Sequence, residues 1–145
     1  MIGFLQRVTV AEVRVDGNVV GQVGAGLLVL IGVQPSDTHE IGQHLLKKIL
    51  KYRIFDDEDG KMNLNLQQID GGLLLVPQFT LAADTRQGLR PGFSTAAAPE
   101  LARRIFDRLV TTAHAQHPHV RSGQFGANMQ ISLTNDGPAT FWLET

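Results

Sequence analysis

Two short apolar stretches, residues 27–33 and 73–76, constrain the fold of this chain more than any other feature. Neither stretch carries a polar side chain, and the first ends in β-branched residues. The first run is typical of a strand that is covered on both faces of a sheet. The second predicts a further strand.

The neighbouring segments also favour strands. Residues 5–15 alternate between apolar and polar, but the apolar parity shifts between Val10 and Val13, which predicts a bulged strand. Turn-forming residues 16–18 then lead into residues 19–23, a pattern that predicts a hairpin. Further strands are expected at 53–55, 129–133 and 139–143, with a turn through 135–138 joining the last two.

Two segments carry apolar residues at helical spacing. The first runs to Lys51, with Asp37 as its expected N-cap and Glu40 three residues later. The second begins at Pro99, a residue favoured in the first turn of a helix. Because most other segments are expected to be strands, the sequence predicts an α+β (mixed α/β) fold. It would be a single β-rich domain, residues 1–145, with two main helices.

The composition fits one globular domain. Of the 145 residues, 43% are apolar and 19% are charged, and the formal net charge is −1, which excludes a disordered chain and a polyanion-binding tail. The chain lacks cysteine, so disulfides, thiolate metal sites and thiol chemistry are excluded. No apolar run reaches the roughly 18 residues of a membrane-spanning helix. We expect a cytoplasmic protein without a membrane partner.

Two clusters of metal-ligating residue types do not predict a metal site. His114, His117 and His119 have no carboxylate nearby in the sequence to complete or orient a site, so a solvated helix end is expected. The acidic segment 56–60 lacks the alternating ligand positions of a calcium loop, which favours an exposed hairpin tip. We therefore expect neither a metal nor a cofactor.

Two polar segments differ from ordinary core or loop. The apolar strand at 73–76 runs directly into Gln78 and Thr80, and buried polar groups need hydrogen-bond partners. The step from Gly137 to Pro138 fits a plain turn as well as a special backbone position. From these residues alone, a strand end and a turn remain the simplest interpretation.

Taken together, Pro77-Gln78-Phe79-Thr80-Leu81 and Asn135-Asp136-Gly137-Pro138-Ala139-Thr140 resemble the two signature motifs of the D-aminoacyl-tRNA deacylase family, Ser-Gln-Phe-Thr-Leu and Asn-x-Gly-Pro-x-Thr. Other segments resemble the family in the same order along the whole chain: 6–8, 15–17, 26–30, 48–50, 53–55, 60–63, 83–86, 90–91 and 125–127. Several ordered segments are more specific than either motif alone.

The resemblance implies a hydrolase that cleaves the ester between a D-amino acid, or glycine, and the 3′-terminal adenosine of tRNA. It also implies a barrel-like sheet core, a homodimer and a chiral proofreading activity that spares L-aminoacyl-tRNA. In the family, the Gly-Pro bond is cis and enters the active site of the partner subunit, where main-chain carbonyls exclude an L side chain. Carried over, this role as a chiral filter belongs to Gly137 and Pro138.

The resemblance also assigns roles to residues of the first motif and its surroundings. The catalytic pocket, which holds the terminal adenosine and the scissile carbonyl, is assigned to Gln78, Phe79 and Thr80. Substrate-binding roles are assigned to Arg7, which braces the Gly-Pro motif, and to Pro77, Met129 and Asn135.

The implied chemistry uses position and backbone. A Thr hydroxyl is a weak nucleophile without a base, and the sequence identifies no base for Thr80. We expect main-chain N–H groups near Phe79 and Thr80 to polarise the ester carbonyl while the substrate's 2′-hydroxyl orients a water molecule. Thr80 as covalent nucleophile is the alternative. Pro77 stands where the family has Ser, which removes a hydroxyl group and a backbone donor, so we expect an effect on rate or substrate preference.

Other functions remain open on the sequence alone. One is a non-catalytic module that binds RNA 3′ ends, and another is a hydrolase of a different small ester. The near-neutral charge predicts weak tRNA binding that touches few phosphates. Either a local basic patch or ordinary solvated surface would account for Lys47, Lys48, Lys51, Arg86 and Arg90.

Overall fold

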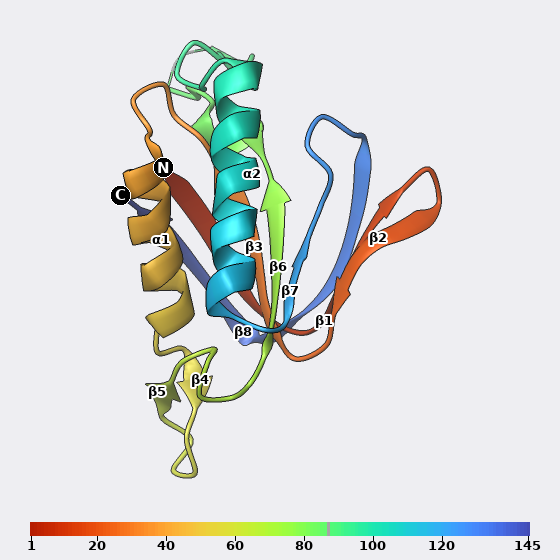
Figure 1. The fold of residues 1–145 in the computed structure, drawn as a ribbon, viewed down its shortest axis with the longest axis vertical. Coiled ribbons are helices and arrows are strands. Elements are labelled where there is room, and N and C mark those ends of the chain that lie inside the picture. The colour runs from red at the N-terminus through yellow and green to blue at the C-terminus, as the bar shows by residue number, and fades with distance from the viewer. Residues whose placement is uncertain (87) are drawn as a thin grey trace.

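The computed structural model describes residues 1–86 and 88–145 (Figure 1). It contains the helices α1 (His39–Lys51) and α2 (Pro99–Gln116) and a short 3-10 helix (Phe79–Ala82). The strands are β1 (Ile2–Val15), β2 (Asn18–Val23), β3 (Gly26–Gly32), β4 (Phe55–Asp56), β5 (Met62–Leu64), β6 (Gly72–Pro77), β7 (Val120–Ser122) and β8 (Met129–Glu144). Among the described residues, no helix has the length and apolar character needed to cross a membrane.

β1 organises the main sheet because it pairs with three other strands. β8 runs antiparallel along one edge of β1, while β3 and then β2 occupy its other edge. β6 pairs in parallel with β3, and β7 pairs in parallel with β6. The strand order is therefore β2-β1-β3-β6-β7, with β8 also on β1, and β4 and β5 form a separate hairpin.

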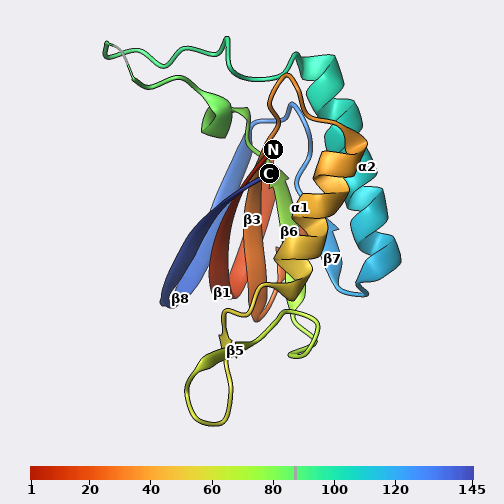
Figure 2. The ribbon, with the colours of Figure 1, turned by 90° about the vertical axis from the view of Figure 1, so that its left-hand side faces the viewer.

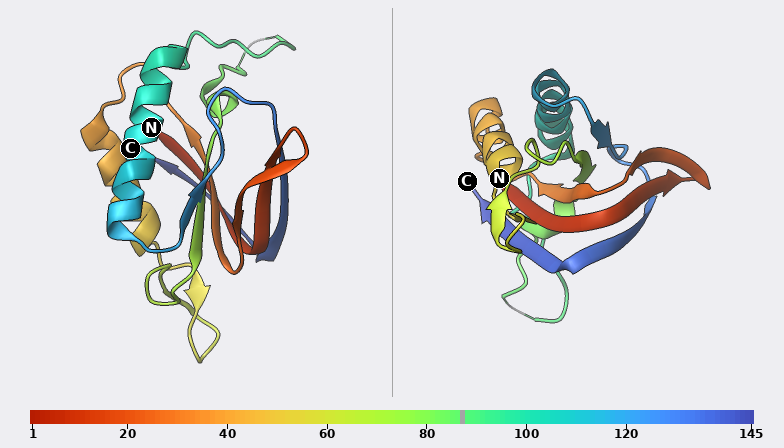
Figure 3. Two further views of the ribbon diagram at one scale, coloured as in Figure 1. Left: turned by 45° about the vertical axis from the view of Figure 1, so that its right-hand side comes forward. Right: turned by 90° about the horizontal axis from the view of Figure 1, so that it is seen from below.

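The main sheet curls into a nearly closed barrel (Figure 3). The curl brings β2 close to β6 and β7. A Cβ atom on Gly21 of β2 would lie 2.9 Å from the carbonyl oxygen of Ser122 in β7, so this close approach requires glycine. The predicted α+β fold, with a barrel-like sheet and two main helices, is confirmed.

Both faces of the central strands β3 and β6 are buried, which confirms the prediction made for residues 27–33. α1 and α2 cover one face of the sheet (Figure 2). Leu27 and Val29 of β3 belong to the core under these helices, whereas Leu28 belongs to the core inside the curl. In β6, Leu73 and Leu74 divide between the two cores in the same way. A polar residue in either strand would therefore be buried whichever way its side chain pointed.

The helices lie where the periodicity placed them, but the expected N-cap of α1 is wrong. Thr38, not Asp37, caps the helix, with its Oγ1 accepting a hydrogen bond from the main-chain N–H of Ile41 at 3.4 Å. Asp37 is buried, and its carboxylate instead accepts from the amino group of Met1 at 2.7 Å and from the main-chain N–H of Gln34 at 2.7 Å. A partner 36 residues away in the sequence overrides the local capping pattern.

The last strands differ from expectation. Residues 129–144 form one strand, β8, rather than two strands joined by a turn. Gln6 of β1 pairs with Thr140 and Val8 pairs with Asn135, so residues 136–139 bulge out of the ladder. The motif around Gly137 is therefore presented by a continuous strand.

The predicted bulged strand is confirmed in β1. Its register against β8 shifts between Gln6 and Val8 and again between Val8 and Val10. Against β2 a further shift follows Val13. The strands β5 and β7, only three residues long each, were not predicted.

The histidine cluster is not uniformly solvated. His117 is 4% exposed and its Nε2 lies 2.7 Å from the carbonyl oxygen of Gly71, so the expected solvated helix end is wrong for this residue. His119 Nε2 lies 3.1 Å from a carboxylate oxygen of Asp70. Within residues 1–86 and 88–145, no three metal-ligating side chains are grouped so that they could hold an ion. Residues 57–60 lie at the predicted hairpin tip, between β4 and β5, and Asp56 ends β4.

Candidate functional site

A pocket of about 440 Å³ lies at the carboxyl end of β6. There the strand ends at Pro77, and the chain enters the 3-10 helix opposite the start of α2 and the segment that follows β7. The lining is mostly apolar and consists of Pro77, Gln78, Phe79, Ala97, Pro99, Ala102, Phe125, Gly126, Ala127, Met129 and Ile131. Four residues that the resemblance assigned to substrate or catalysis thus share one cavity.

Gln78, Phe79 and Thr80 place polar and aromatic groups beside this pocket. The Gln78 amide donates from Nε2 to Oγ1 of Thr80. Phe79 is 56% exposed, and its ring centroid lies 5.1 Å from that of Phe93. The main-chain N–H groups of Phe79 and Thr80 have no hydrogen-bond partner among the described residues, as is usual in the first turn of a helix. Two main-chain donors are therefore free next to an exposed aromatic ring.

The chain beyond the 3-10 helix is held by an ion pair. Arg86 donates from Nε and Nη2 to the two carboxylate oxygens of Asp84, each at 2.9 Å. These hydrogen bonds lower the pKa of Asp84 to about 2. Asp84 also exchanges main-chain hydrogen bonds with Gly92 at 2.8 and 2.9 Å. The guanidinium of Arg86 is thus already paired with a carboxylate.

The basic residues considered above do not form one patch. The carboxyl end of α1, which carries Lys47, Lys48 and Lys51, points towards the β4–β5 hairpin (Figures 1 and 2). Residues 83–86 and 88–98 lie at the opposite end of the molecule (Figure 2). The lysines are therefore remote from the pocket at β6.

The second motif lies in the bulge of β8. The peptide bond between Gly137 and Pro138 is cis, and the φ angle of Gly137 is +117°. The positive φ angle favours glycine here, and a Cβ atom at Gly137 would lie 2.7 Å from Nη2 of Arg7, so the Arg7 guanidinium would have to shift. Gly137 and Pro138 are exposed.

Arg7 supports this bulge from beneath. It is 6% exposed and donates from Nε to the carbonyl oxygen of Asp136 at 3.1 Å and from Nη1 to the carbonyl oxygen of Ile54 at 2.8 Å. Carboxylate oxygens of Asp136 and Asp56 lie 3.4 and 3.5 Å from the guanidinium. Arg7 therefore connects the bulge to the start of the β4–β5 hairpin.

Asn135 closes the base of the bulge. Its Nδ2 donates to Oγ1 of Thr140 at 2.7 Å, and its Oδ1 accepts from the main-chain N–H of Ala139 at 2.8 Å. The side chain thus joins residues on both sides of the Gly-Pro step. Within one chain, Asn135 and Arg7 use their polar atoms to shape the bulge.

The two motifs lie at opposite ends of the sheet within one chain. Asn135 pairs with Val8, Val8 pairs with Gly26, and Gly26 pairs with Gly72 at the start of β6. The pocket lies at the other end of β6, after Pro77, so at 3.3 Å per residue the motifs are separated by roughly 17 Å along the strand. The predicted site residues fall into two groups: Pro77, Gln78, Phe79, Thr80 and Met129 in one, and Arg7, Asn135, Gly137 and Pro138 in the other.

Several pocket residues were not predicted. Ala102 and Ile131 carry only apolar signals that also fit ordinary core, and Pro99 fitted a helix start. Phe125 is the exception, because residues 125–127 were among the segments that resemble the deacylase family. That resemblance could have directed attention to this wall.

Comparisons with known proteins cover the whole chain. The family model described as D-Tyr-tRNA(Tyr) deacylase matches residues 4–144. A D-aminoacyl-tRNA deacylase of Pseudomonas fluorescens (strain SBW25) is 60% identical over 145 residues, covering 100% of both chains. One of Thioalkalivibrio sulfidiphilus (strain HL-EbGR7) is 59% identical over 144 residues, covering 99% of this chain and 97% of its own.

Solved structures show the same fold. The c-Myc DNA Unwinding Element Binding Protein has a TM-score of 0.95 and 34% identity, covering 100% of this chain and 99% of its own. A probable eukaryotic D-amino acid tRNA deacylase has a TM-score of 0.83 at 18% identity, with 98% of each chain covered, which is a likeness of fold alone.

Together these matches favour a hydrolase acting on aminoacyl-tRNA over a non-catalytic RNA-binding module. Relatives named as deacylases span the full length of the chain, including both motifs. The chain belongs to the D-Tyr-tRNA(Tyr) deacylase family, and it is an enzyme that deacylates aminoacyl-tRNA.

Proposed function

We propose that the chain, acting as one domain of residues 1–145, works in the cytoplasm as a homodimer. It hydrolyses the ester between a D-amino acid, or glycine, and the 3′-terminal adenosine of tRNA, and it spares L-aminoacyl-tRNA. Each active site combines the pocket of one subunit with the partner subunit's Gly137 and the partner subunit's Pro138.

The observation that carries this proposal is the separation of the two motifs. Gly137 and Pro138 are exposed at one end of the sheet, and the pocket opens at the other end, roughly 17 Å away along β6. One chain cannot close this gap without breaking the pairing of β1 and β8. A second copy brings an exposed bulge to the pocket without any change in fold.

The pocket suits the terminal adenosine. Its volume of about 440 Å³ falls within the usual range of small-molecule sites. Phe125, Met129 and Ile131 offer apolar surface to the base, and bases are commonly bound by stacking against aromatic side chains. With the base in this cavity, the ester lies near Gln78, Phe79 and Thr80.

Hydrolysis then depends on main-chain donors. The free N–H groups of Phe79 and Thr80 donate to the ester carbonyl oxygen and stabilise the negative charge that develops as water attacks the carbonyl carbon. One donor of this kind contributes roughly 3 kcal/mol to transition-state stabilisation. The substrate's 2′-hydroxyl orients the water. The C–O bond to the 3′ oxygen breaks, that oxygen takes a proton, and a free amino acid and a tRNA with a 3′-hydroxyl are released.

Chirality is read by exclusion. Main-chain carbonyls of the partner's bulge approach the α-carbon on the side where an L side chain would project, so a D-amino acid and glycine fit while an L-amino acid collides. Such a filter must hold its position. Arg7 and Asn135 supply that support, because together they hydrogen-bond to the main chain on both sides of the Gly-Pro step and to Thr140.

The test is a dimer assembled from two different variants. Ala127→Trp fills the pocket, and Gly137→Ala disturbs the filter through its contact with Arg7. In a co-expressed heterodimer purified by two tags, one site is damaged twice and the other has an open pocket and an unaltered filter. We expect the heterodimer to cleave D-tyrosyl-tRNA and glycyl-tRNA at about half the wild-type rate per dimer while sparing L-tyrosyl-tRNA.

The two homodimers are the controls. Ala127→Trp should be inactive and still dimeric by light scattering, and Gly137→Ala should lose discrimination against L-tyrosyl-tRNA. A heterodimer as unselective as Gly137→Ala would overturn the shared site. Absence of D-tyrosyl-tRNA turnover by the wild-type protein would overturn the proposed substrate.

A further inference from the structure

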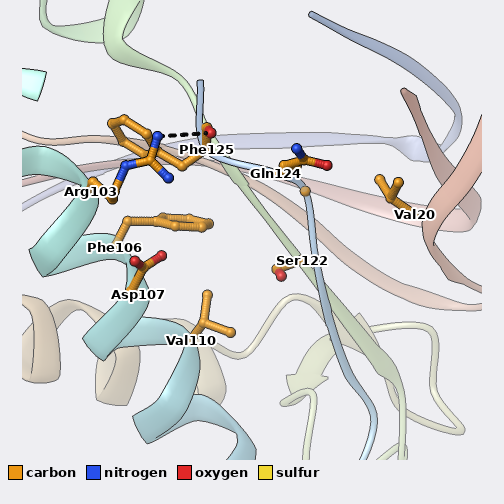
Figure 4. A pocket seen from close by; sticks show the side chains of 9 residues that line it. Val20, Arg103, Phe106, Asp107, Val110, Ser122, Gln124 and Phe125 are labelled. Carbon is orange, nitrogen blue, oxygen red and sulfur yellow. Dashed lines mark hydrogen bonds between the residues drawn. The ribbon is translucent and has the colours of Figure 1, made fainter. Parts of the chain in front are cut away.

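A second pocket (Figure 4) shares Phe125 in its lining with the pocket at β6. Its volume is about 410 Å³, and it lies between α2 and the segment that ends β7. In Figure 4, Arg103, Asp107 and Val110 come from the α2 side, while Ser122 and Gln124 face them from the other side. Neither the sequence motifs nor the proposed reaction uses this pocket.

Its walls combine aromatic surface with polar groups. Phe106 is buried, and its ring lies among the lining residues together with that of Phe125 (Figure 4). The side chains of Asp107, Ser122 and Gln124 make no hydrogen bond within the part of the chain that the structure describes. They therefore leave an acceptor, a hydroxyl group and an amide available to a ligand.

Arg103 connects the two pockets through Phe125. Its guanidinium carbon lies 4.8 Å from the centroid of the Phe125 ring, and its Nη2 donates to the carbonyl oxygen of Phe125 at 3.4 Å. Phe125 lines both cavities, so a ligand group in one pocket is a near neighbour of a group in the other. Two adjacent nucleotides of a single strand could therefore place one base in each pocket.

The charges favour a base over a phosphate in the second pocket. A phosphate would meet the carboxylate of Asp107 and be repelled by it. A base offers a flat apolar face for the aromatic walls and a polar edge for the side chains, and unstacked bases of single-stranded RNA are bound in this way. Cytosine, like adenine and unlike uracil, presents an amino donor that a carboxylate can accept, next to acceptor atoms that Arg and Gln can address.

We propose that the second pocket binds the base of the penultimate nucleotide of the tRNA 3′ end, which is a cytosine in every tRNA. The inference rests on the proposed function, because it requires the terminal adenosine in the pocket at β6. Asp107 accepts from N4 of the cytosine, and Arg103 and Gln124 donate to its N3 and O2 atoms. The pocket thus recognises the invariant end of tRNA and not any particular tRNA.

The test uses short substrates that differ at this one base. D-Tyrosyl esters of adenosine, of the dinucleotide CpA and of UpA are compared by kcat/KM with the wild-type homodimer. Uracil places an acceptor, O4, where cytosine has its amino group, and that acceptor would face Asp107. We expect CpA to exceed both adenosine and UpA by about tenfold, which is within the range for a specific base contact.

Asp107→Asn supplies the discriminating variant. Its amide can donate to O4 of uracil, so the preference for CpA over UpA should fall to about one or reverse. Glu100→Gln is the matched control, because it removes one negative charge from the same helix and Glu100 does not line this pocket. The control should keep the wild-type ratio of CpA to UpA.

Other outcomes overturn the proposal and are separable from failure of the reaction itself. If the wild-type protein cleaves all three esters equally well, the pocket does not bind the penultimate base, although the deacylase reaction stands. The same conclusion follows if Asp107→Asn keeps the preference for CpA. If none of the three esters is cleaved while D-tyrosyl-tRNA is, recognition lies elsewhere on the tRNA. If D-tyrosyl-tRNA is not cleaved either, the proposed function fails first.

Discussion

At the scale of single residues, Arg7 links the bulge that carries the proposed filter to the start of the β4–β5 hairpin. Its guanidinium is buried, and it holds the carbonyl oxygens of Asp136 and Ile54 while nearby carboxylates balance its charge. Gly137 leaves no room for a Cβ atom beside this group. The position of the bulge therefore depends on the buried guanidinium of Arg7 and on the lack of a side chain at Gly137.

Thr80 tests how the ester is broken. Its hydroxyl accepts a hydrogen bond from the Gln78 amide, and an amide cannot act as a base. Among the described residues, the Thr80 hydroxyl makes no hydrogen bond with a histidine or a carboxylate. If main-chain donors and an oriented water carry the reaction, Thr80→Ala should lower kcat for D-tyrosyl-tRNA by less than about tenfold. Loss of a true nucleophile costs orders of magnitude more.

The measurement is single-turnover hydrolysis of D-tyrosyl-tRNA, with Thr80→Ser as the control that keeps the hydroxyl. A fall of a thousandfold or more in Thr80→Ala, restored in Thr80→Ser, would establish covalent catalysis instead. A trapped acyl-enzyme in the wild-type protein would lead to the same conclusion.

At the scale of elements, β8 shows how one strand presents a functional segment. Asn135 bonds to the main-chain N–H of Ala139 and to the hydroxyl of Thr140, which fixes both ends of the bulge. Asn135→Ala removes both contacts. We expect a loss of stability of about 1 kcal/mol per hydrogen bond and weaker rejection of L-tyrosyl-tRNA.

Hydrogen exchange of the Ala139 amide reports directly on this change, because that N–H loses its acceptor. Asn18→Ala is the matched control, since the Asn18 side chain makes a longer hydrogen bond in the β1–β2 turn, to the Asp16 carbonyl at 3.4 Å. If exchange at Ala139 and the D-to-L ratio stayed as in the wild-type protein, Asn135 would not shape the filter.

The elements also show which parts of the fold local patterns encode. The apolar stretches in β3 and β6 were predicted because both faces of these strands are buried. The single strand β8 was not, because Asp136, Gly137 and Pro138 are turn-forming residues, and only the pairing of both flanks with β1 keeps the strand continuous. Likewise, the local pattern predicted Asp37 as the N-cap of α1, but its carboxylate binds the buried amino group of Met1 instead.

At the scale of the whole molecule, the formal net charge of −1 offers little overall attraction to the tRNA backbone. The lysines of α1 lie away from the pocket, and Arg86 is paired with Asp84. We expect few phosphate contacts. A plot of log kcat/KM for D-tyrosyl-tRNA against log salt concentration should have a slope shallower than about −2, since each single-stranded phosphate contact contributes about −0.7.

The double variant Lys47→Gln, Lys48→Gln is the control and should leave this slope unchanged. A slope steeper than about −4, or a slope that becomes shallower when these lysines are replaced, would show that a long tract of tRNA backbone is bound.

The separation of the two motifs within one chain could not be read from sequence patterns alone. The motifs themselves marked Gln78, Thr80, Gly137 and Pro138, but spacing along a chain says nothing of which end of a sheet each reaches. That depends on strand order, here β1 between β3 and β8. Pocket walls such as Ala102 were invisible for a different reason, because a small apolar residue on a helix looks the same whether it faces core or cavity.

One strand carries both kinds of component. β8 begins with Met129 and Ile131 in the wall of the pocket, and a few residues later it bears Gly137 and Pro138. In the proposed dimer, the length of β8 therefore fixes the distance between the pocket of its own subunit and the Gly-Pro bulge that enters the partner's pocket. Inserting a single residue between Ile131 and Gly137 would turn the following side chains to the other face of the sheet. Because both subunits would carry the insertion, both proposed active sites of the dimer would be disrupted.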